Sequence, residues 1–341
     1  MNNILVSVCI PVFNREKIIS HTIDSVINQS YKNIEIIVSD NCSTDNTFNI
    51  LESYAKKDRR IKLFKMEINK GPVENWRNCF VNSSGQIIKF LWSDDYIDLD
   101  FIKRTLKELK FNVGFVYTPV KWYDVKSMKI CQDIGFKIVN KSLLTLDFFV
   151  ESLILQGSVP VSGTCAIFRR NIIGDLFSSN ISNCLNLNYN INGAGFDSLM
   201  FLYAKKNYNY FAYTDDVFAY YGVDKDSISV QDGEKLTPYY FSFFFGFLKE
   251  FKYGTKLIAK FKSRILFYKF FYIRDEHTKD LLDKLLFIIN NKLDYLFLIK
   301  LIVKNYFMDK LKAFQKRILN KLKNVYSSTL FDLKVKQNDT E

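Results

Sequence analysis

From residue 4 to residue 118 the chain alternates between short apolar runs and segments with helical spacing, and this alternation constrains the fold most strongly. Ile4–Phe13 and Ile34–Ser39 are rich in Val and Ile, as is typical of strands buried on both faces. Between them, Glu16–Asn28 places apolar residues three and four positions apart, which indicates a helix. The same reasoning predicts strands at 61–66, 87–92 and 113–118, and helices at 44–57, 73–81 and 100–110.

Buried strands that alternate with helices predict βαβ units and a mostly parallel sheet. The fold class is therefore α/β, with a Rossmann-like sheet flanked by helices. Such sheets bind ligands beyond the carboxyl ends of their strands. Three polar segments follow predicted strands, namely Pro11–Arg15, Asp40–Asp45 and Ser93–Asp95, so we expect a binding site there.

The pattern weakens after residue 118. An irregular loop region is expected over 121–138, and the chain becomes helical throughout after Pro238. Between these regions we expect a helix at 143–155, a strand at 165–168, a helix from Gly195 to Tyr203, and short strands at 210–213 and 217–221.

The net charge of +12 is concentrated in the last hundred or so residues. Residues 1–240 hold 27 Lys and Arg against 26 Asp and Glu, whereas residues 241–341 hold 21 against 10. We therefore predict two domains, an α/β domain over 1–237 and a basic helical region over 238–341.

The basic region has the pattern of helices that lie in a membrane interface. Over 247–271 the cationic residues recur every three or four positions and apolar residues fall mainly opposite, and 310–323 repeats the design. The alternative is a helical appendage packed on the α/β domain with a solvated basic face. No recognised nucleic-acid module is present, so we expect no nucleic-acid partner. The cationic residues of the first segment are Lys249, Lys252, Lys256, Lys260 and Arg264.

Candidate metal ligands must be carboxylates, because the only histidines, His21 and His277, lie far apart in the sequence. Asp94 and Asp95 follow a predicted buried strand. In a turn both side chains can converge, so that one holds a hard cation such as Mg²⁺ or Mn²⁺ and the other a ribose hydroxyl. The alternative is that Asp94, Asp95, Asp98 or Asp100 caps the next helix.

Three further residues, two after predicted strands and one on a helix after the Gly71-Pro72 loop, each allow two interpretations. Asp40 could accept a hydrogen bond from the N–H of a nucleobase, or form a local turn and helix cap. Phe13 could pack against a base or belong to the core. Arg77 could reach a base or a diphosphate, or be a solvated helix charge.

In combination and order, these features resemble the family 2 glycosyltransferases with a GT-A fold, and in particular the branch that builds bacterial O-antigen and similar surface polysaccharides. The resemblance covers about residues 4–230. The matching segments are Val8–Asn14, Ser25–Tyr31, Glu35–Thr47, Asn69–Pro72 and Ser93–Asp95.

The resemblance implies a role for each matching residue. A nucleotide-sugar site would include Asn14 and Ser93, with Asp40 accepting from the base and Asp94 holding the ribose. Asp95 would bind the metal. The base would be lined by Pro11, Val12 and Phe13, and either Arg77 or Asn75 would lie near the base or diphosphate. The family usually has another acid where this chain has Trp92.

The resemblance also implies a general base. A strand with a Gly-Thr and a basic pair, here Gly163–Arg170, precedes a helix that begins with an acid, and Asp197 occupies that position. Phe196 replaces the Glu that often precedes the acid. The alternative role for Asp197 is a helix cap. Farther on, Asp224 stands where relatives often have a metal-contacting His, which suggests an extra carboxylate ligand, and Gly222 stands where they have Arg.

The expected function is therefore inverting transfer of a sugar from a nucleoside-diphosphate sugar to a hydroxyl of a glycan acceptor, with lipid-linked glycans favoured, assisted by Mn²⁺ or Mg²⁺. The expected location is cytoplasmic, peripheral on the inner face of the cytoplasmic membrane. Two alternatives are a sugar nucleotidyltransferase and a non-catalytic nucleotide-sugar or glycan-binding protein. The first usually has a glycine-rich loop after its first strand, and this chain has none there.

Overall fold

A computed structural model describes residues 4–134, 143–156, 159, 162–179, 184–224, 231–290 and 292–305, leaving aside the side chains of 132–134 and 156. The chain divides into two compact units. The first comprises Met1–Tyr253 and Ile273–Ile289, and the second comprises Gly254–Tyr272 and Asn290–Glu341. The helix α9 (Thr237–Glu250) thus belongs to the first unit.

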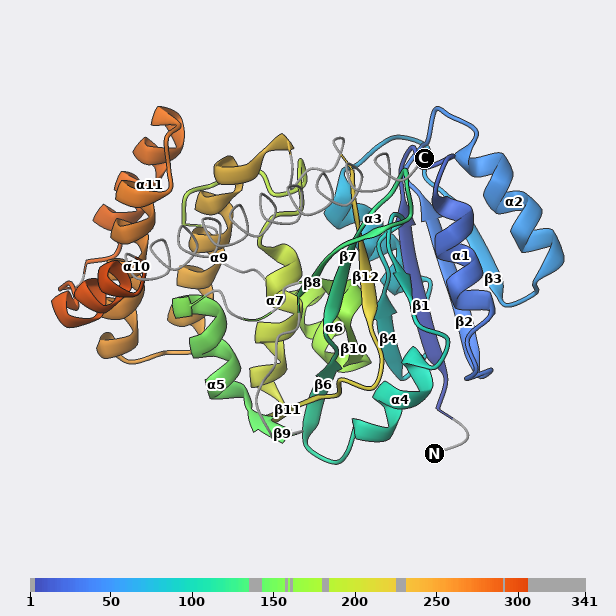
Figure 1. Cartoon of the computed structure of the whole chain (residues 1–341), viewed down its shortest axis with the longest axis horizontal. Helices are drawn as coiled ribbons and strands as arrows, with labels where there is room; N and C mark the ends of the chain where they lie inside the picture. Colours follow the sequence, from blue (N-terminus) through green and yellow to red (C-terminus); the bar gives the residue numbers. More distant parts are fainter. Residues whose placement is uncertain are drawn as a thin grey trace, which may run out of the picture. The chain divides into compact units, whose positions relative to one another are not determined.

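The first unit is built on an eight-stranded sheet in the order β3-β2-β1-β4-β10-β6-β11-β9. All strands run parallel except β9 and β10, so the prediction of a mostly parallel sheet is confirmed (Figure 1). The strands are β1 (Val6–Val12), β2 (Ile34–Asp40), β3 (Ile61–Lys65), β4 (Ile87–Phe90), β6 (Val113–Tyr117), β9 (Leu143–Thr145), β10 (Ala166–Arg169) and β11 (Tyr210–Tyr213).

Four helices, at 19–27, 47–57, 72–81 and 101–108, form near the positions that the apolar spacing predicts, whereas the helix at 170–178 was not predicted. The helix α3 packs on β1 and β2, and α4 packs on β6 and β10. Their buried faces supply the core because each helix presents one apolar stripe to the sheet. The helices of the first unit are α1 (Ile19–Ile27), α2 (Thr47–Lys57), α3 (Pro72–Val81), α4 (Phe101–Glu108), α5 (Leu146–Glu151), α6 (Arg170–Ser178), α7 (Phe196–Leu202), α9 and α11 (Glu276–Ile288), with short turns at Ser152–Gln156, Gly163–Cys165, Tyr203–Lys206 and Gly233–Leu236.

A second sheet, in the order β5-β12-β7-β8, corrects the expectation of an irregular loop over 121–138 as far as residue 134; residues 135–138 lie outside the described residues. The strands β7 and β8 pair in antiparallel fashion. They are hard to predict from the sequence because few of their described side chains are buried; Trp122, for example, is 38% exposed. The strands are β5 (Tyr96–Ile97), β7 (Val120–Asp124), β8 (Ile130–Ile134) and β12 (Ala219–Val223).

The helix expected over 143–155 also differs, because it begins with the strand β9 before α5. The Thr145 side chain accepts a hydrogen bond from the Phe148 N–H and so caps α5. The N-terminal start of α5 is therefore set by a capping threonine that the apolar pattern did not reveal.

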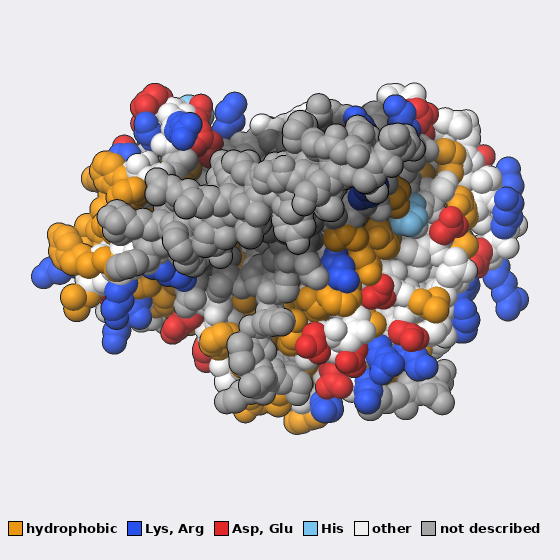
Figure 2. Space-filling view, viewed as in Figure 1, with side chains coloured by type: hydrophobic (Ala, Val, Ile, Leu, Met, Phe, Trp, Pro, Cys, Tyr) orange, Lys and Arg blue, Asp and Glu red, His pale blue; other side chains and the backbone are white. Residues whose placement is uncertain are grey.

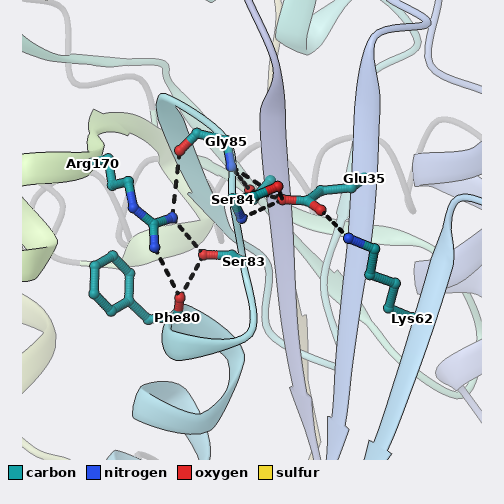
Figure 3. Close-up of polar contacts among 8 residues, drawn as sticks. Glu35, Lys62, Phe80, Ser83, Ser84, Gly85 and Arg170 are labelled. Atoms are coloured by element: carbon teal, nitrogen blue, oxygen red, sulfur yellow. Dashed lines mark hydrogen bonds and ion pairs between the residues drawn. The ribbon is translucent and has the colours of Figure 1, made fainter.

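A buried ionic cluster ties the first unit together at the edge of the sheet opposite the polar strand ends (Figure 3). The Glu35 carboxylate accepts hydrogen bonds from Ser7 Oγ at 2.6 Å, Ser84 N at 2.6 Å and Lys62 Nζ at 2.7 Å. Burial alone would raise the pKa of Glu35, but these hydrogen bonds lower it to about 2. Glu35 thus fixes the Ser84–Gly85 loop that leads into β4.

The second unit contains α10 (Thr255–Phe271) and helical residues 295–305. Ser263 Oγ donates to the Asp294 carbonyl at 3.1 Å, and Tyr272 Oη donates to Asn305 Oδ1 at 2.7 Å, so the two helices are joined. Among the helices of the described ranges, we find none with the length and apolarity needed to cross a bilayer.

The continuous basic helix face expected over 247–271 is wrong. The helix breaks between Glu250 and Thr255, where Lys252 takes a φ of 52°. Lys249 and Lys252 therefore lie outside α10, and Arg264 on α10 is buried at 5% exposure. The second basic segment, 310–323, lies outside the described residues.

Candidate active site

The carboxyl ends of β1, β2 and β4 meet at one edge of the sheet, as parallel strands require. Val12 at the end of β1 stands opposite Asp40 at the end of β2, and Cys9 stands opposite Phe90 at the end of β4. The Leu91 N–H donates to the Cys9 carbonyl at 3.0 Å and so leads the chain into the Ser93–Asp95 turn. The predicted polar segments therefore do lie together.

Asp40 is fully buried and forms the local turn that was its alternative role. Its carboxylate accepts hydrogen bonds from the Ser43 hydroxyl and from the Ser43 N–H. Asn14, in the left-handed region at φ 50°, accepts from Thr44 N at 2.9 Å and thereby joins the β1 and β2 ends. Phe13 between them is 38% exposed, whereas Pro11 and Val12 are buried.

The structure separates the two candidates on α3. Asn75 is buried and donates from Nδ2 to the Val12 carbonyl at 3.3 Å, at the end of β1. Its Oδ1 has no hydrogen-bond partner within the described residues. Arg77 instead donates to the Phe177 carbonyl at 2.8 Å and lies 3.6 Å from Glu74. Asn75 joins the strand ends and Arg77 does not.

Asp95 is held on both carboxylate oxygens. Thr164 Oγ1 donates to Oδ2 at 2.6 Å, and the Gly222 N–H donates to Oδ1 at 2.9 Å. Thr164 reaches the turn because β10 is antiparallel to β4, and so β10 begins at the edge where β4 ends. Burial, and then the charge of Asp94, raise the pKa of Asp95 well above its usual range.

Asp94 directly precedes Asp95, and Asp224 lies close enough to Asp94 for their negative charges to interact. Burial raises the pKa of Asp94, the Arg15 guanidinium lowers it, and the negative charge of Asp224 raises it further. Arg15 Nη2 lies 3.4 Å from Asp94 Oδ2. Three carboxylates and one guanidinium thus share this edge. Ser93 is buried, and its carbonyl accepts from Thr22 Oγ1 at 3.1 Å.

Position 222 requires glycine for a steric reason. A Cβ there would lie 2.2 Å from the Asp94 carbonyl oxygen, closer than real atoms approach. The strand β12 pairs with β5 directly after the acid turn, with Tyr220 opposite Tyr96, and this pairing brings the Gly222 N–H to Asp95. A larger residue here is incompatible with the turn as it stands.

Asp197 lies in the first turn of α7, where burial raises its pKa to about 7. Its Oδ1 accepts from the Ser198 N–H at 2.8 Å. Gly195, at φ 82°, allows α7 to start against α9, since a Cβ there would lie 2.8 Å from the Phe243 ring. A carboxyl whose pKa lies near neutrality can exchange protons at physiological pH.

Two stacked tryptophans connect the acid turn to Asp197. Trp92, which directly precedes Ser93, stacks on Trp76 at a centroid distance of 4.6 Å. Trp76 in turn packs against Phe196, the neighbour of Asp197, at 6.1 Å. Two of the positions that depart from the family pattern, Trp92 and Phe196, therefore belong to one aromatic cluster, and each is next to or near one of the acidic groups.

The donor set fits a hard divalent cation. Each carboxylate oxygen of Asp95 has a lone pair beyond the hydrogen bond it accepts, and Asp94 and Asp224 add negative charge that a cation would offset. Within the described ranges, no three His, Cys, Asp or Glu side chains come close enough together to complete a metal site by themselves.

Sequence reasoning missed the residues that hold the acids. Arg15 follows the predicted β1 segment directly and was visible as a lone cation at a strand end. Thr164 was noted only as part of a landmark, and Gly222 only as a departure. Lys89, in the buried strand β4, carried the strongest signal, because a lysine within an apolar run requires a buried partner.

The comparisons with known proteins agree with this architecture. A sequence model described as glycosyl transferase family 2 matches residues 7–177. The chain belongs to that family.

Among curated relatives, the Escherichia coli protein WfgD is named UDP-Glc:alpha-D-GlcNAc-diphosphoundecaprenol beta-1,3-glucosyltransferase. It is 39% identical over 119 residues, which cover 34% of this chain and 46% of that protein. The chain spans less than half the length of the curated relatives that it matches first.

Solved structures share the GT-A-like fold. S. aureus TarS 1-349 in complex with UDP-GlcNAc has a TM-score of 0.57 at 19% identity, covering 82% of this chain and 81% of that one. Mannosyltransferase PcManGT from Pyrobaculum calidifontis, in complex with GDP-Man and Mn²⁺, has a TM-score of 0.51 at 15% identity, covering 89% and 87%.

Proposed function

We propose that this chain transfers a sugar from a nucleoside-diphosphate sugar to a hydroxyl of a glycan acceptor, with inversion at the anomeric carbon. One observation supports the proposal: Trp92, which precedes the acid turn, stacks on Trp76, and Trp76 packs against Phe196, the neighbour of Asp197. An acidic turn suited to a cation and a carboxyl with a pKa of about 7 would thus be parts of one site.

The nucleotide would lie at the ends of β1 and β2. Pro11–Asn14 and Asp40 line this edge, and the partly exposed Phe13 ring offers a surface for a base. The unpartnered Asn75 Oδ1 can accept a hydrogen bond from a base N–H, so we favour Asn75 over Arg77 for this role. Asp94 would take the ribose hydroxyl, with Ser93 beside it.

Asp95 would hold Mn²⁺ or Mg²⁺, with Asp224 as a further carboxylate nearby. The support is the hard-oxygen donor set and the Mn²⁺ named with the Pyrobaculum calidifontis enzyme. When bound, the cation would offset the charge that develops on the departing diphosphate. Arg15, whose Nη2 lies 3.4 Å from Asp94 Oδ2, adds a protein-borne positive charge at the same edge.

Asp197 would act as the general base. As the acceptor oxygen bonds to the anomeric carbon, its proton passes to the Asp197 carboxylate. The bond from that carbon to the diphosphate oxygen breaks, and the nucleoside diphosphate leaves with the electron pair. Such proton transfer typically contributes about 10²–10⁴-fold to the rate.

The acceptor is proposed to be a lipid-linked glycan in surface polysaccharide synthesis, because the Escherichia coli relative is named for a diphosphoundecaprenol acceptor. Peripheral binding on the inner face of the cytoplasmic membrane would suit such an acceptor. In support, Figure 2 shows hydrophobic side chains beside Lys and Arg side chains in the region of α10. The exposed apolar residues of the second unit include Phe270, Phe271, Tyr295, Leu296 and Ile299.

A transfer assay with the full chain tests the proposal. Nucleoside diphosphate release is measured with a panel of UDP- and GDP-sugars, Mn²⁺ and a GlcNAc-diphospholipid acceptor. We expect release that depends on acceptor, and at least a hundredfold loss in Asp197→Asn with donor binding retained. The matched control is Asp215→Asn, an exposed acid, which should keep full activity. Equal activity of both variants would contradict the assigned base.

A further inference from the structure

Lys89 is a fully buried lysine that the proposed mechanism leaves without a role, and burial lowers its pKa to about 7. It lies in β4, six positions before Asp95, and its whole side chain is shielded from water. Burying an ammonium group is costly unless it gains hydrogen bonds or a counter-charge. The position of Lys89 therefore calls for a structural or functional partner.

The Lys89 ammonium finds its partners on the Gly163–Thr164 turn. Nζ donates to the Thr164 carbonyl and, at 3.4 Å, to the Gly163 carbonyl, and it lies 4.3 Å from the centre of the Phe101 ring. These contacts hold the backbone of the Gly163–Thr164 turn in place next to the acid turn. A side chain without an amino group, such as that of Met, would leave both carbonyls without this donor.

Thr164 passes this restraint on to the acid turn. Its hydroxyl accepts from the Trp92 N–H at 3.2 Å and donates to Asp95 Oδ2 at 2.6 Å. One side chain therefore joins the end of β4 to the carboxylate that follows it. With the Gly222 N–H on Oδ1, the hydroxyl leaves Asp95 a single orientation.

We propose that Lys89 and Thr164 are positioning residues that together orient the Asp95 carboxylate for its cation, Lys89 by holding the Thr164 backbone and Thr164 by its hydroxyl. The inference rests on the proposed function of Asp95. Partners behind a metal ligand typically change metal affinity by about 10–100-fold. Here the effect should appear in cation-dependent nucleotide binding.

The test measures Mn²⁺ binding by electron paramagnetic resonance, and the binding of UDP and GDP with and without Mn²⁺, on the full chain. Thr164→Val keeps the shape but removes the hydroxyl, and we expect Mn²⁺ affinity in the presence of nucleotide to fall at least tenfold. Nucleotide binding without Mn²⁺ should not change. Thr164→Ser restores the hydroxyl and should recover affinity to within threefold of the wild type.

Thr118→Val is the matched control. Thr118 is equally buried and its hydroxyl contacts the Pro119 and Cys165 carbonyls but not Asp95. The Thr118→Val variant should have a lower free energy of unfolding than the wild type but the same Mn²⁺ affinity. Lys89→Met should weaken Mn²⁺ binding in the same direction as Thr164→Val, and thermal unfolding of each variant shows whether it is folded.

The outcomes separate the two claims. If Asp95→Asn abolishes Mn²⁺-dependent binding but Thr164→Val matches Thr118→Val, the positioning role is wrong while the cation role stands. If Asp95→Asn leaves Mn²⁺-dependent binding unchanged, both are wrong. Equal loss of nucleotide binding with and without Mn²⁺ in folded Thr164→Val also overturns the inference, since it indicates general damage to the site.

Discussion

Asp197→Asn should make the protein more stable as it removes activity, and the gain should depend on pH. The folded pKa of Asp197 is about 7, against an ordinary value of 3.8. Between these values the folded chain retains a proton that the unfolded chain has lost. Stability therefore decreases as the pH rises through this window, because the buried carboxyl must ionise.

The size of the effect follows from the shift. One pKa unit corresponds to about 1.4 kcal/mol, so a shift of about three units sets a ceiling of about 4 kcal/mol. Asp197 keeps some exposure to water, which reduces the expected change to about 2 kcal/mol. Asn carries no charge at any of these pH values, so the variant should lack this loss.

The assay is urea unfolding followed by tryptophan fluorescence at pH 4.5 and pH 8. All three tryptophans, Trp76, Trp92 and Trp122, lie in the first unit, so the signal reports the unit that holds Asp197. The stability difference between Asp197→Asn and the wild type should move in favour of the variant by about 2 kcal/mol at the higher pH.

Asp215→Asn provides the control, because Asp215 is exposed and its replacement should change the free energy of unfolding little. A difference between Asp197→Asn and the wild type that does not change with pH would refute the reasoning that burial raises the pKa of Asp197. Activity should show the opposite trend: kcat/KM of the wild type should fall about tenfold per pH unit below 7, because a protonated Asp197 cannot accept the acceptor proton.

Three further predictions concern other parts of the chain. Gly222→Ala should collide with the Asp94 carbonyl and reduce donor binding at least tenfold, as titration calorimetry would show; unchanged binding would mean that the turn tolerates a Cβ. Glu35→Gln should destabilise the fold by about 2–3 kcal/mol at pH 7 but much less near pH 2, because a carboxyl with a lowered pKa stabilises above its unfolded value and loses this as the pH falls; an equal loss at both pH values in urea unfolding would argue against it. The full chain should float with anionic vesicles, and Phe270→Ser with Phe271→Ser should weaken this binding; equal flotation would exclude these side chains as contacts.

The first half of the fold was predictable because its strands are buried on both faces. In a run such as Ile34–Ser39 every residue is buried and most are apolar, so the whole run indicates a strand. The parallel order of the strands then determines which strand ends lie together. The pairing of β7 with β8 was not predicted, because these strands are short and partly exposed. The helix break after Glu250 was not predicted either, because it depends on a positive φ at Lys252 that composition does not reveal.

The acids of the candidate site were predictable, but their supports were not. Asp94, Asp95 and Asp197 stand at strand or helix ends that the pattern locates. Thr164 reaches Asp95 only because β10 runs antiparallel to β4, a tertiary pairing that one sequence does not specify. The Trp92–Trp76 stack likewise depends on how α3 packs against the end of β4.

Nuclear magnetic resonance of donor turnover tests the central claim most directly. The full chain is incubated with α-linked nucleotide sugars, with Mn²⁺ or with excess chelator, and the configuration of the first-formed sugar product is read from its anomeric proton. The account predicts a β product that forms with Mn²⁺ and is lost with chelator and in Asp95→Asn. An α product, or turnover that neither chelator nor Asp95→Asn affects, would contradict it.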